Sequence, residues 1–197
     1  MQKLLITFLG KAVENSSYRL TRYRFDDGSI SETRYFGQAL AQQQRPDRMI
    51  LLGTRGSMWD VLFDDLGQGN EHQEDRTALI DEAATSSVSE ERLQRLTPLL
   101  ERQIGLPCQL CLIPYGRDAA EQVQILEVMA RHVGEQDQVI IDVTHGFRYL
   151  PMLGLLSALY LRAVKKTTIQ GLYYGAMEMT EHGETPVLRL DGLLTLA

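Results

Sequence analysis

The 197-residue chain is 44% hydrophobic and 23% charged, and its formal net charge at pH 7 is −6. Such values are typical of a globular protein with one domain, or one domain and a small appendage. The acidic balance argues against broad binding to duplex nucleic acid, which depends on neutralising many phosphates. The most apolar stretch, residues 150–161, falls short of the ~20 residues that a membrane span needs, and the first apolar run is too short for a signal peptide, so we expect no membrane segment.

Apolar runs and turn signals predict strands that alternate with helices. The expected strands are residues 3–9, 18–24, 29–36, 48–52, 107–113, 139–143, 167–179 and 186–190. The expected helices are residues 37–44, 58–66, 76–84, 90–104, 118–133 and a last one from 149 or 150 to 163. Their expected starts are marked by Ser57, by a capping box of Ser87 and Glu90, and by Asp118 with Glu121. This alternation predicts an α/β fold, a Rossmann-like doubly wound and mostly parallel sheet with helices on both faces, and β-hairpins in addition.

We expect one domain over residues 1–197. The helices near residues 74–104 are expected to be an insertion between two core strands. The chain turns apolar again after Asp191, and domains rarely end on an apolar run without packing it, so residues 191–197 are predicted to begin a linker to an effector domain absent from this chain.

The two cysteines, Cys108 and Cys111, form a C-x-x-C pair that could suggest zinc or redox chemistry. They fall in an expected strand, where positions three apart face opposite sides. We therefore expect two small core residues, no metal site and a protein of the reducing cytoplasm.

The most informative stretch is Gln138–Met152, in which the apolar run of residues 139–143 is followed by Thr144-His145-Gly146 and then by Pro151. This pattern predicts a buried strand, a polar turn and a buried helix, since proline is tolerated in the first turn of a helix. In an open α/β sheet such a turn lies at the carboxyl edge of the strands, where ligands bind. The glycine permits close approach of backbone, and the helix start offers N–H groups to an anion.

Glycine and a basic residue recur at the ends of the expected core strands. The pairs are Gly10-Lys11, Gly53-Thr54-Arg55, Gly116-Arg117 and Gly146-Phe147-Arg148. Any one cation alone is best explained as a solvated loop charge. Because parallel strands end at one edge, the recurrence predicts an anion-binding site there.

The segment Asp142-Val143-Thr144-His145-Gly146 resembles the Asp-x-Thr-His-Gly motif of CRISPR-associated Rossmann-fold (CARF) proteins, which sense cyclic oligoadenylates in type III CRISPR antiviral defence. Residues 4–10 and 50–54 resemble the first and second strand ends of that family. The resemblance implies a homodimer that binds cyclic oligoadenylate across its two-fold axis, and we expect the tetramer because its symmetry matches that axis. It implies ligand contacts from Thr144, His145, Gly146 and Arg148, with Gly10, Lys11, Thr54 and Arg55 completing the pocket.

Some members of this family also cut their ligand, so sensing alone and sensing with slow ring-nuclease activity both stay open. Cleavage here would be metal-independent and needs no cofactor: the ribose 2′-hydroxyl would attack the neighbouring phosphate. The candidate catalytic residues are Thr144 to orient the hydroxyl, Lys11 and Arg148 to stabilise charge, and His145 either as a base or as a structural residue that fixes the turn.

Two other classes of function remain open on sequence alone. The chain could be a nucleotide-metabolising enzyme with a Rossmann-like sheet, although it lacks a dinucleotide fingerprint and a Walker sequence. It could also be a ligand-gated transcription regulator, although no basic helix-turn-helix is visible.

Overall fold

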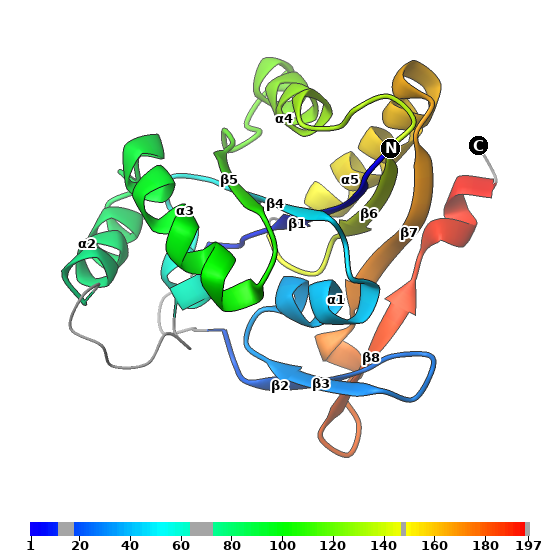
Figure 1. Cartoon of the computed structure of the whole chain (residues 1–197), viewed down its shortest axis with the longest axis horizontal. Coiled ribbons are helices and arrows are strands. Elements are labelled where there is room, and N and C mark those ends of the chain that lie inside the picture. The colour runs from blue at the N-terminus through cyan, green and yellow to red at the C-terminus, as the bar shows by residue number, and fades with distance from the viewer. Residues whose placement is uncertain (12–17, 64–72, 147–148, 196–197) are drawn as a thin grey trace.

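The computed structural model describes residues 1–11, 18–63, 73–146 and 149–195. Its centre is an eight-stranded sheet with the strand order β3-β2-β8-β7-β6-β1-β4-β5 (Figure 1). The strands are β1 Lys3–Phe8, β2 Thr21–Arg24, β3 Ile30–Thr33, β4 Arg48–Gly53, β5 Cys108–Leu112, β6 Gln138–Asp142, β7 Thr168–Gly175 and β8 Glu184–Arg189.

Strands β7, β6, β1, β4 and β5 run parallel to one another, with β1 between β6 and β4. Two antiparallel hairpins, β2–β3 and β7–β8, extend this parallel sheet, and they join because β2 pairs with β8 in parallel. The predicted Rossmann-like, mostly parallel α/β fold with added hairpins is therefore confirmed.

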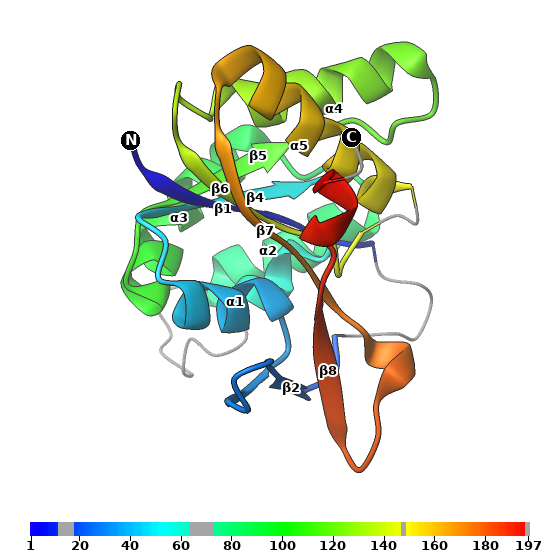
Figure 2. The same ribbon diagram turned by 90° about the vertical axis from the view of Figure 1, so that its right-hand side faces the viewer.

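Helices cover both faces of the parallel strands (Figure 2). One face carries α1 Phe36–Gln44, α2 Gln73–Ala84 and α3 Glu90–Ile104; the other carries α4 Ala119–Arg131 and α5 Leu150–Lys165. Successive strand residues alternate between two buried clusters: Leu5 packs on the α1–α3 side and Ile6 on the α4–α5 side. Burial on both faces explains why these strands are continuous apolar runs.

The two cysteines follow the same alternation. Cys108 belongs to the buried cluster on the α1–α3 side, whereas Cys111 belongs to the cluster on the α4–α5 side. Both are buried free thiols, so the prediction of two core residues on opposite faces is confirmed.

Two predicted helix starts are wrong, and the hydroxyl groups explain why. Ser57 does not cap an α-helix: its hydroxyl donates to the carbonyl of Leu9 and accepts from the amide of Thr54, and a 3-10 helix, Trp59–Phe63, follows. Ser87 Oγ bonds the carbonyl of Glu82 and so helps to end α2. Ser89 is the N-cap of α3, with its Oγ 3.2 Å from the amide of Arg92. Residues 64–66, the expected end of the first of these helices, lie outside the described residues.

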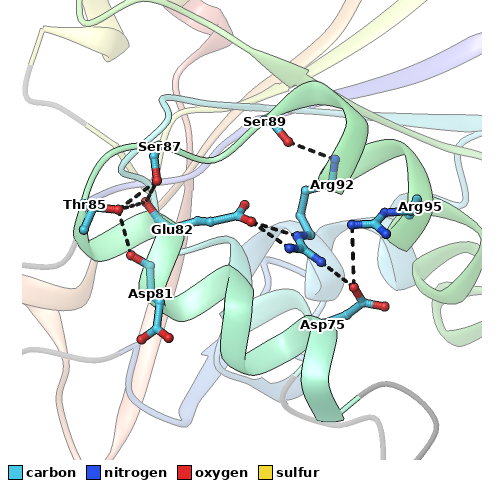
Figure 3. A network of polar contacts seen from close by, with 8 residues as sticks. All are labelled: Asp75, Asp81, Glu82, Thr85, Ser87, Ser89, Arg92 and Arg95. Carbon is cyan, nitrogen blue, oxygen red and sulfur yellow. Dashed lines mark hydrogen bonds and ion pairs between the residues drawn. The ribbon is translucent and has the colours of Figure 1, made fainter.

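Helices α2 and α3 connect β4 to β5 and are held together by a charged network (Figure 3). The guanidinium of Arg92 on α3 lies between two carboxylates of α2, bonding Glu82 at 2.8 and 3.0 Å and also Asp75. Its hydrogen bonds with Glu82, together with the charges of both carboxylates, raise the pKa of Arg92 and keep it cationic. The pair is thereby fixed beside the sheet edge described below.

The chain after β8 forms a short 3-10 helix, Asp191–Thr195, that packs against α5 and β7. Leu194 is buried there, and its carbonyl accepts a hydrogen bond from Arg162 at 2.9 Å. A linker that begins in this segment stays a prediction. In the part of the chain that the structure describes, we find no helix long and apolar enough to cross a membrane.

Candidate ligand pocket at the sheet edge

The turn after β6 meets the end of β1 at the carboxyl edge of the parallel strands. A Cβ added to Gly10 would lie 3.1 Å from the backbone nitrogen of Gly146, so these two segments approach so closely that a side chain would force one of them to shift. Gly146 has φ 117°, a conformation that L side chains rarely adopt, and a Cβ there would lie 2.5 Å from Leu150. The backbone path at this edge therefore requires glycine at 146 and favours it at 10.

A pocket of about 820 Å³ opens beside these two glycines. Its inner side consists of the strand ends Gly10, Lys11, Thr144, His145 and Gly146, together with Met58. Its outer side comes from the segment before β2, from strands β2 and β3, and from the β7–β8 hairpin; these residues are Tyr18, Arg19, Leu20, Thr21, Arg22, Glu32, Arg34, Met177, Thr180, Gly183 and Thr185. Figure 1 shows β2, β3 and the β7–β8 hairpin gathered below the parallel strands.

Thr144 is fixed by contacts on both sides. Its amide donates to Asp142 Oδ1 at 2.8 Å, and its hydroxyl accepts from the amide of Gly175, where β7 ends, at 2.8 Å. The turn after β6 and the base of the β7–β8 hairpin are thereby joined through one hydroxyl group.

Asp142 lies beneath this turn and is fully buried. Its Oδ2 accepts from the hydroxyl of Thr7 at 2.5 Å, and Thr7 Oγ1 lies 2.7 Å from the hydroxyl of Tyr35. Burial raises the pKa of Asp142 to about 6, because the hydrogen bonds from Thr7 and Thr144 offset only part of the desolvation. This carboxyl group holds the turn and is not among the residues that line the pocket.

His145 is 8% exposed and is packed among aromatic rings. Its ring contacts that of Tyr18 edge-on at 4.4 Å between centroids and stacks on Tyr35 at 5.5 Å. Its Nε2 accepts the amide of Phe36 at 3.3 Å, and burial lowers the pKa of His145 to about 3. The side chain is therefore a neutral imidazole with Nε2 as the acceptor, which places it in a structural role.

The outer side of the pocket brings basic residues that the sequence-based site did not include: Arg19, Arg22 and Arg34. Arg22 pairs with Glu184 on β8 at 3.5 Å, and Arg34 donates to the carbonyl of Tyr18 at 3.0 Å. The signal that could have found them is the density of arginine in the predicted hairpin of residues 18–36. The sequence did not assign these arginines to the site, because nothing in it places that hairpin opposite Lys11.

The predicted site residues at the ends of β4 and β5 do not line this pocket. Thr54 is buried, and its carbonyl accepts from the indole of Trp59, whereas Arg55 Nη1 donates to the carbonyl of Val88 at 2.8 Å. Gly53 is a packing glycine, because a Cβ there would lie 2.6 Å from Trp59. These residues support the loop after β4.

Gly116 and Arg117, the pair expected at the end of β5, directly follow Tyr115. The guanidinium of Arg117 lies 4.9 Å from the centre of the Tyr115 ring, and a Cβ on Gly116 would meet the ring of Tyr149. Burial opposes ionisation of the Tyr115 phenol, yet hydrogen bonds with Ser86 and Thr54 and the charges of Lys11 and Arg117 together lower its pKa. Lys11 is thus electrostatically coupled both to this group and to the pocket. Phe147 and Arg148 lie outside the described residues.

The pocket offers cations, hydroxyl groups and apolar side chains. Among the described residues, no three His, Cys, Asp or Glu side chains gather as they would around a metal ion. Cations with a glycine-lined backbone suit phosphate, and apolar side chains such as Leu20 and Met177 suit a flat base. This combination fits an anionic ligand with a nucleoside part.

Comparison with known proteins matches most of the chain to a described family. The profile of the family described as "CRISPR system endoribonuclease Csx1, CARF domain" matches residues 4–178. The chain is also similar to the CRISPR-associated protein MJ1674 of Methanocaldococcus jannaschii, with 24% identity over 224 residues. That alignment covers all of this chain and 35% of the relative, so the chain spans about a third of the relative's length.

Proposed function

This chain belongs to the CARF-domain family of Csx1-type proteins of type III CRISPR systems, and on that premise we propose that it is a sensor of cyclic oligoadenylate, with the cyclic tetramer as its preferred ligand. The observation that carries the proposal is the pocket in which Gly10, Lys11 and the turn Thr144–Gly146 face a basic outer side. Backbone at the glycines can approach phosphate closely, while Lys11 and the arginines opposite supply charge.

We propose further that the ligand is shared by two copies of the chain. The pocket volume of about 820 Å³ is within the ~300–1,000 Å³ of small-molecule sites, whereas a ring of four nucleotides is larger than a typical small molecule. Helix α5 follows the turn Thr144–Gly146 and exposes a stripe of apolar side chains spaced four residues apart. These are Met152, Leu156, Tyr160 and Val164, which are 46–66% exposed. A two-fold contact along this stripe would place two pockets near one axis.

The described residues support binding of the ring better than its cleavage. The Thr144 hydroxyl is already engaged by Gly175, and His145 Nε2 by Phe36. An imidazole whose pKa is about 3 is a weak base at neutral pH. Incubation of labelled cyclic tetra-adenylate with excess protein in EDTA is expected to return the intact ring; a linear product with a 2′,3′-cyclic phosphate would establish the ring-nuclease alternative.

Because the similar protein of M. jannaschii is much longer than this chain, we propose that the effector activity resides in a part of the protein outside residues 1–197. The sensor would then act by changing how two such parts are held relative to each other in the dimer.

Isothermal titration calorimetry with cyclic tri-, tetra- and hexa-adenylate, linear tetra-adenylate, mononucleotides and dinucleotide cofactors tests the proposal. We expect the cyclic tetramer to bind most tightly, and Lys11→Ala to weaken it by roughly 10- to 100-fold, because a charge-assisted hydrogen bond is worth about 1.5–3 kcal/mol. Arg131→Ala, which removes one exposed positive charge from α4, is the matched control and should leave the affinity unchanged. Failure of the unaltered chain to bind any cyclic oligoadenylate would refute the proposal, and preferred binding of a dinucleotide cofactor would favour the enzyme alternative.

A further inference from the structure

Glu32 is the one acidic residue among the described residues that line the pocket. The pocket otherwise presents the cations Lys11, Arg19, Arg22 and Arg34 together with hydroxyl and apolar groups. A carboxylate so placed repels phosphate, so it works against a site whose only task is to attract a polyanion. Such a carboxylate is compatible with a bound polyanion if the protein neutralises it, or if the ligand brings a hydrogen-bond donor to it.

The protein does not neutralise Glu32 within the described residues. Arg22 stands directly opposite Glu32 in the β2–β3 ladder, where a cross-strand ion pair would be natural. The guanidinium of Arg22 instead turns to the other neighbouring strand and pairs with Glu184 at 3.5 Å, and Glu184 also takes Arg24 at 3.4 Å. The side chain of Glu32 is exposed, and its carboxylate has no hydrogen bond or ion pair to any residue that the structure describes.

The position of Glu32 in the sheet separates it from the phosphate-binding side. β3 is the outermost strand, and β2, β8 and β7 lie between it and β6, whose end carries the Thr144–Gly146 turn. In a cyclic oligonucleotide the phosphates form the ring and the bases project from it. If the phosphates of such a ring lie at Lys11 and Gly146, we expect a base to extend toward the outer side of the pocket, where Leu20, Met177 and Glu32 are among the lining residues.

We propose that Glu32 determines the base specificity of this pocket by accepting a hydrogen bond from the exocyclic amine of adenine. This inference rests on the proposed cyclic oligonucleotide function and adds to it the recognition of the base. A carboxylate has only acceptor oxygens, so it accepts from an amine and repels the carbonyl oxygen that hypoxanthine or guanine carries at the same position. No described side chain besides Glu32 brings a negative charge to the pocket, so base discrimination of this kind rests on it.

The test compares how removal of Glu32 changes the binding of a ring that carries the exocyclic amine and of a ring that lacks it. Binding of cyclic tetra-adenylate and of cyclic tetra-inosinate, which replaces each amine by a carbonyl oxygen, is measured by calorimetry for the unaltered chain, Glu32→Ala and Glu32→Gln. In Glu32→Ala we expect about tenfold weaker binding of the adenylate ring and equal or tighter binding of the inosinate ring. Glu32→Gln, whose amide oxygen still accepts, is expected to retain part of the preference for adenine. Glu181→Ala removes an exposed carboxylate from the β7–β8 hairpin outside the pocket lining and is the matched control.

Four results overturn the inference. If Glu32 is only a solvated charge, its removal strengthens binding of both rings, since a repulsive charge has been lost. If it contacts the ribose, Glu32→Ala weakens both rings equally. If the unaltered chain binds neither ring, the proposed function fails and this inference fails with it. Binding of the adenylate ring with no dependence on Glu32 refutes the inference alone. Unchanged circular dichroism and thermal midpoint of the variants show that the exposed substitution leaves the fold intact.

Discussion

The buried imidazole of His145 should make the stability of this domain depend on pH in a way that one substitution removes. Its folded pKa is about 3, against ~6.5 in an unfolded chain. Between these values the unfolded chain binds a proton that the native state excludes, so the contribution of His145 is fully present above about pH 6.5 and is lost as the pH falls toward 3.

The magnitude follows from the two pKa values. At pH 4.5, which is two units below the pKa of the unfolded imidazole, protonation stabilises the unfolded chain by about 2.7 kcal/mol. At pH 7 the same protonation stabilises it by only ~0.2 kcal/mol. His145 should therefore cost the native state about 2.5 kcal/mol between pH 7 and pH 4.5. Asp142 acts in the opposite direction, because its folded pKa of about 6 lies above that of the unfolded chain, so the native state binds a proton at a higher pH. This protonation stabilises the native state by roughly 2 kcal/mol at pH 4.5.

The opposed contributions nearly cancel in the unaltered chain, so the assay compares it with His145→Gln. Urea unfolding at pH 7 and at pH 4.5 is measured for both proteins. Gln keeps an oxygen that can accept the amide of Phe36, but it does not titrate. We expect the loss of unfolding free energy on acidification to be about 2.5 kcal/mol larger in the unaltered chain than in the variant. A difference below about 0.5 kcal/mol would mean that His145 is charged or solvated in the fold, and would refute the burial argument.

Three further predictions concern the fold and the assembly. In thermal melts, Gly146→Ala should lower the unfolding free energy by about 3 kcal/mol or more, because the strain of a positive φ and a clash with Leu150 add. Gly183→Ala, which also has a positive φ but nothing within 4 Å of the added Cβ, should lower it by only ~1 kcal/mol. Arg92→Ala should leave two carboxylates of α2 without their partner, destabilise the domain by about 1–2 kcal/mol and speed hydrogen exchange in α2; unchanged exchange there would contradict the role of the network. Leu156→Glu on the α5 stripe should give a monomer in light scattering while Ile80→Glu, on exposed α2, keeps the dimer; a dimer in both would exclude that face.

Most of the helices and strands follow from local properties of the sequence. Continuous apolar runs such as residues 48–52 can be buried on both faces only in a parallel sheet covered by helices, and Pro151 fits only near a helix start, so strand, turn and helix around Thr144 were predictable. The same holds for the cysteines, because the twofold period of a strand separates Cys108 from Cys111 without further information.

Tertiary structure alone decided which strand ends share a site. The sequence places glycine and a cation after each of four strands, but only Gly10-Lys11 and the turn at Gly146 reach the pocket among the described residues. Arg55 is held by a backbone carbonyl of the α2–α3 connection and Arg117 by an aromatic ring. The outer side of the pocket, with Glu32 and Arg22, depends on the pairing of β2 with β8, which brings Arg22 beside the distant Glu184. Such long-range pairing is set by packing of the whole sheet, whereas glycine, proline and hydrophobic period act locally, and so the sequence determined the elements while the fold determined the site.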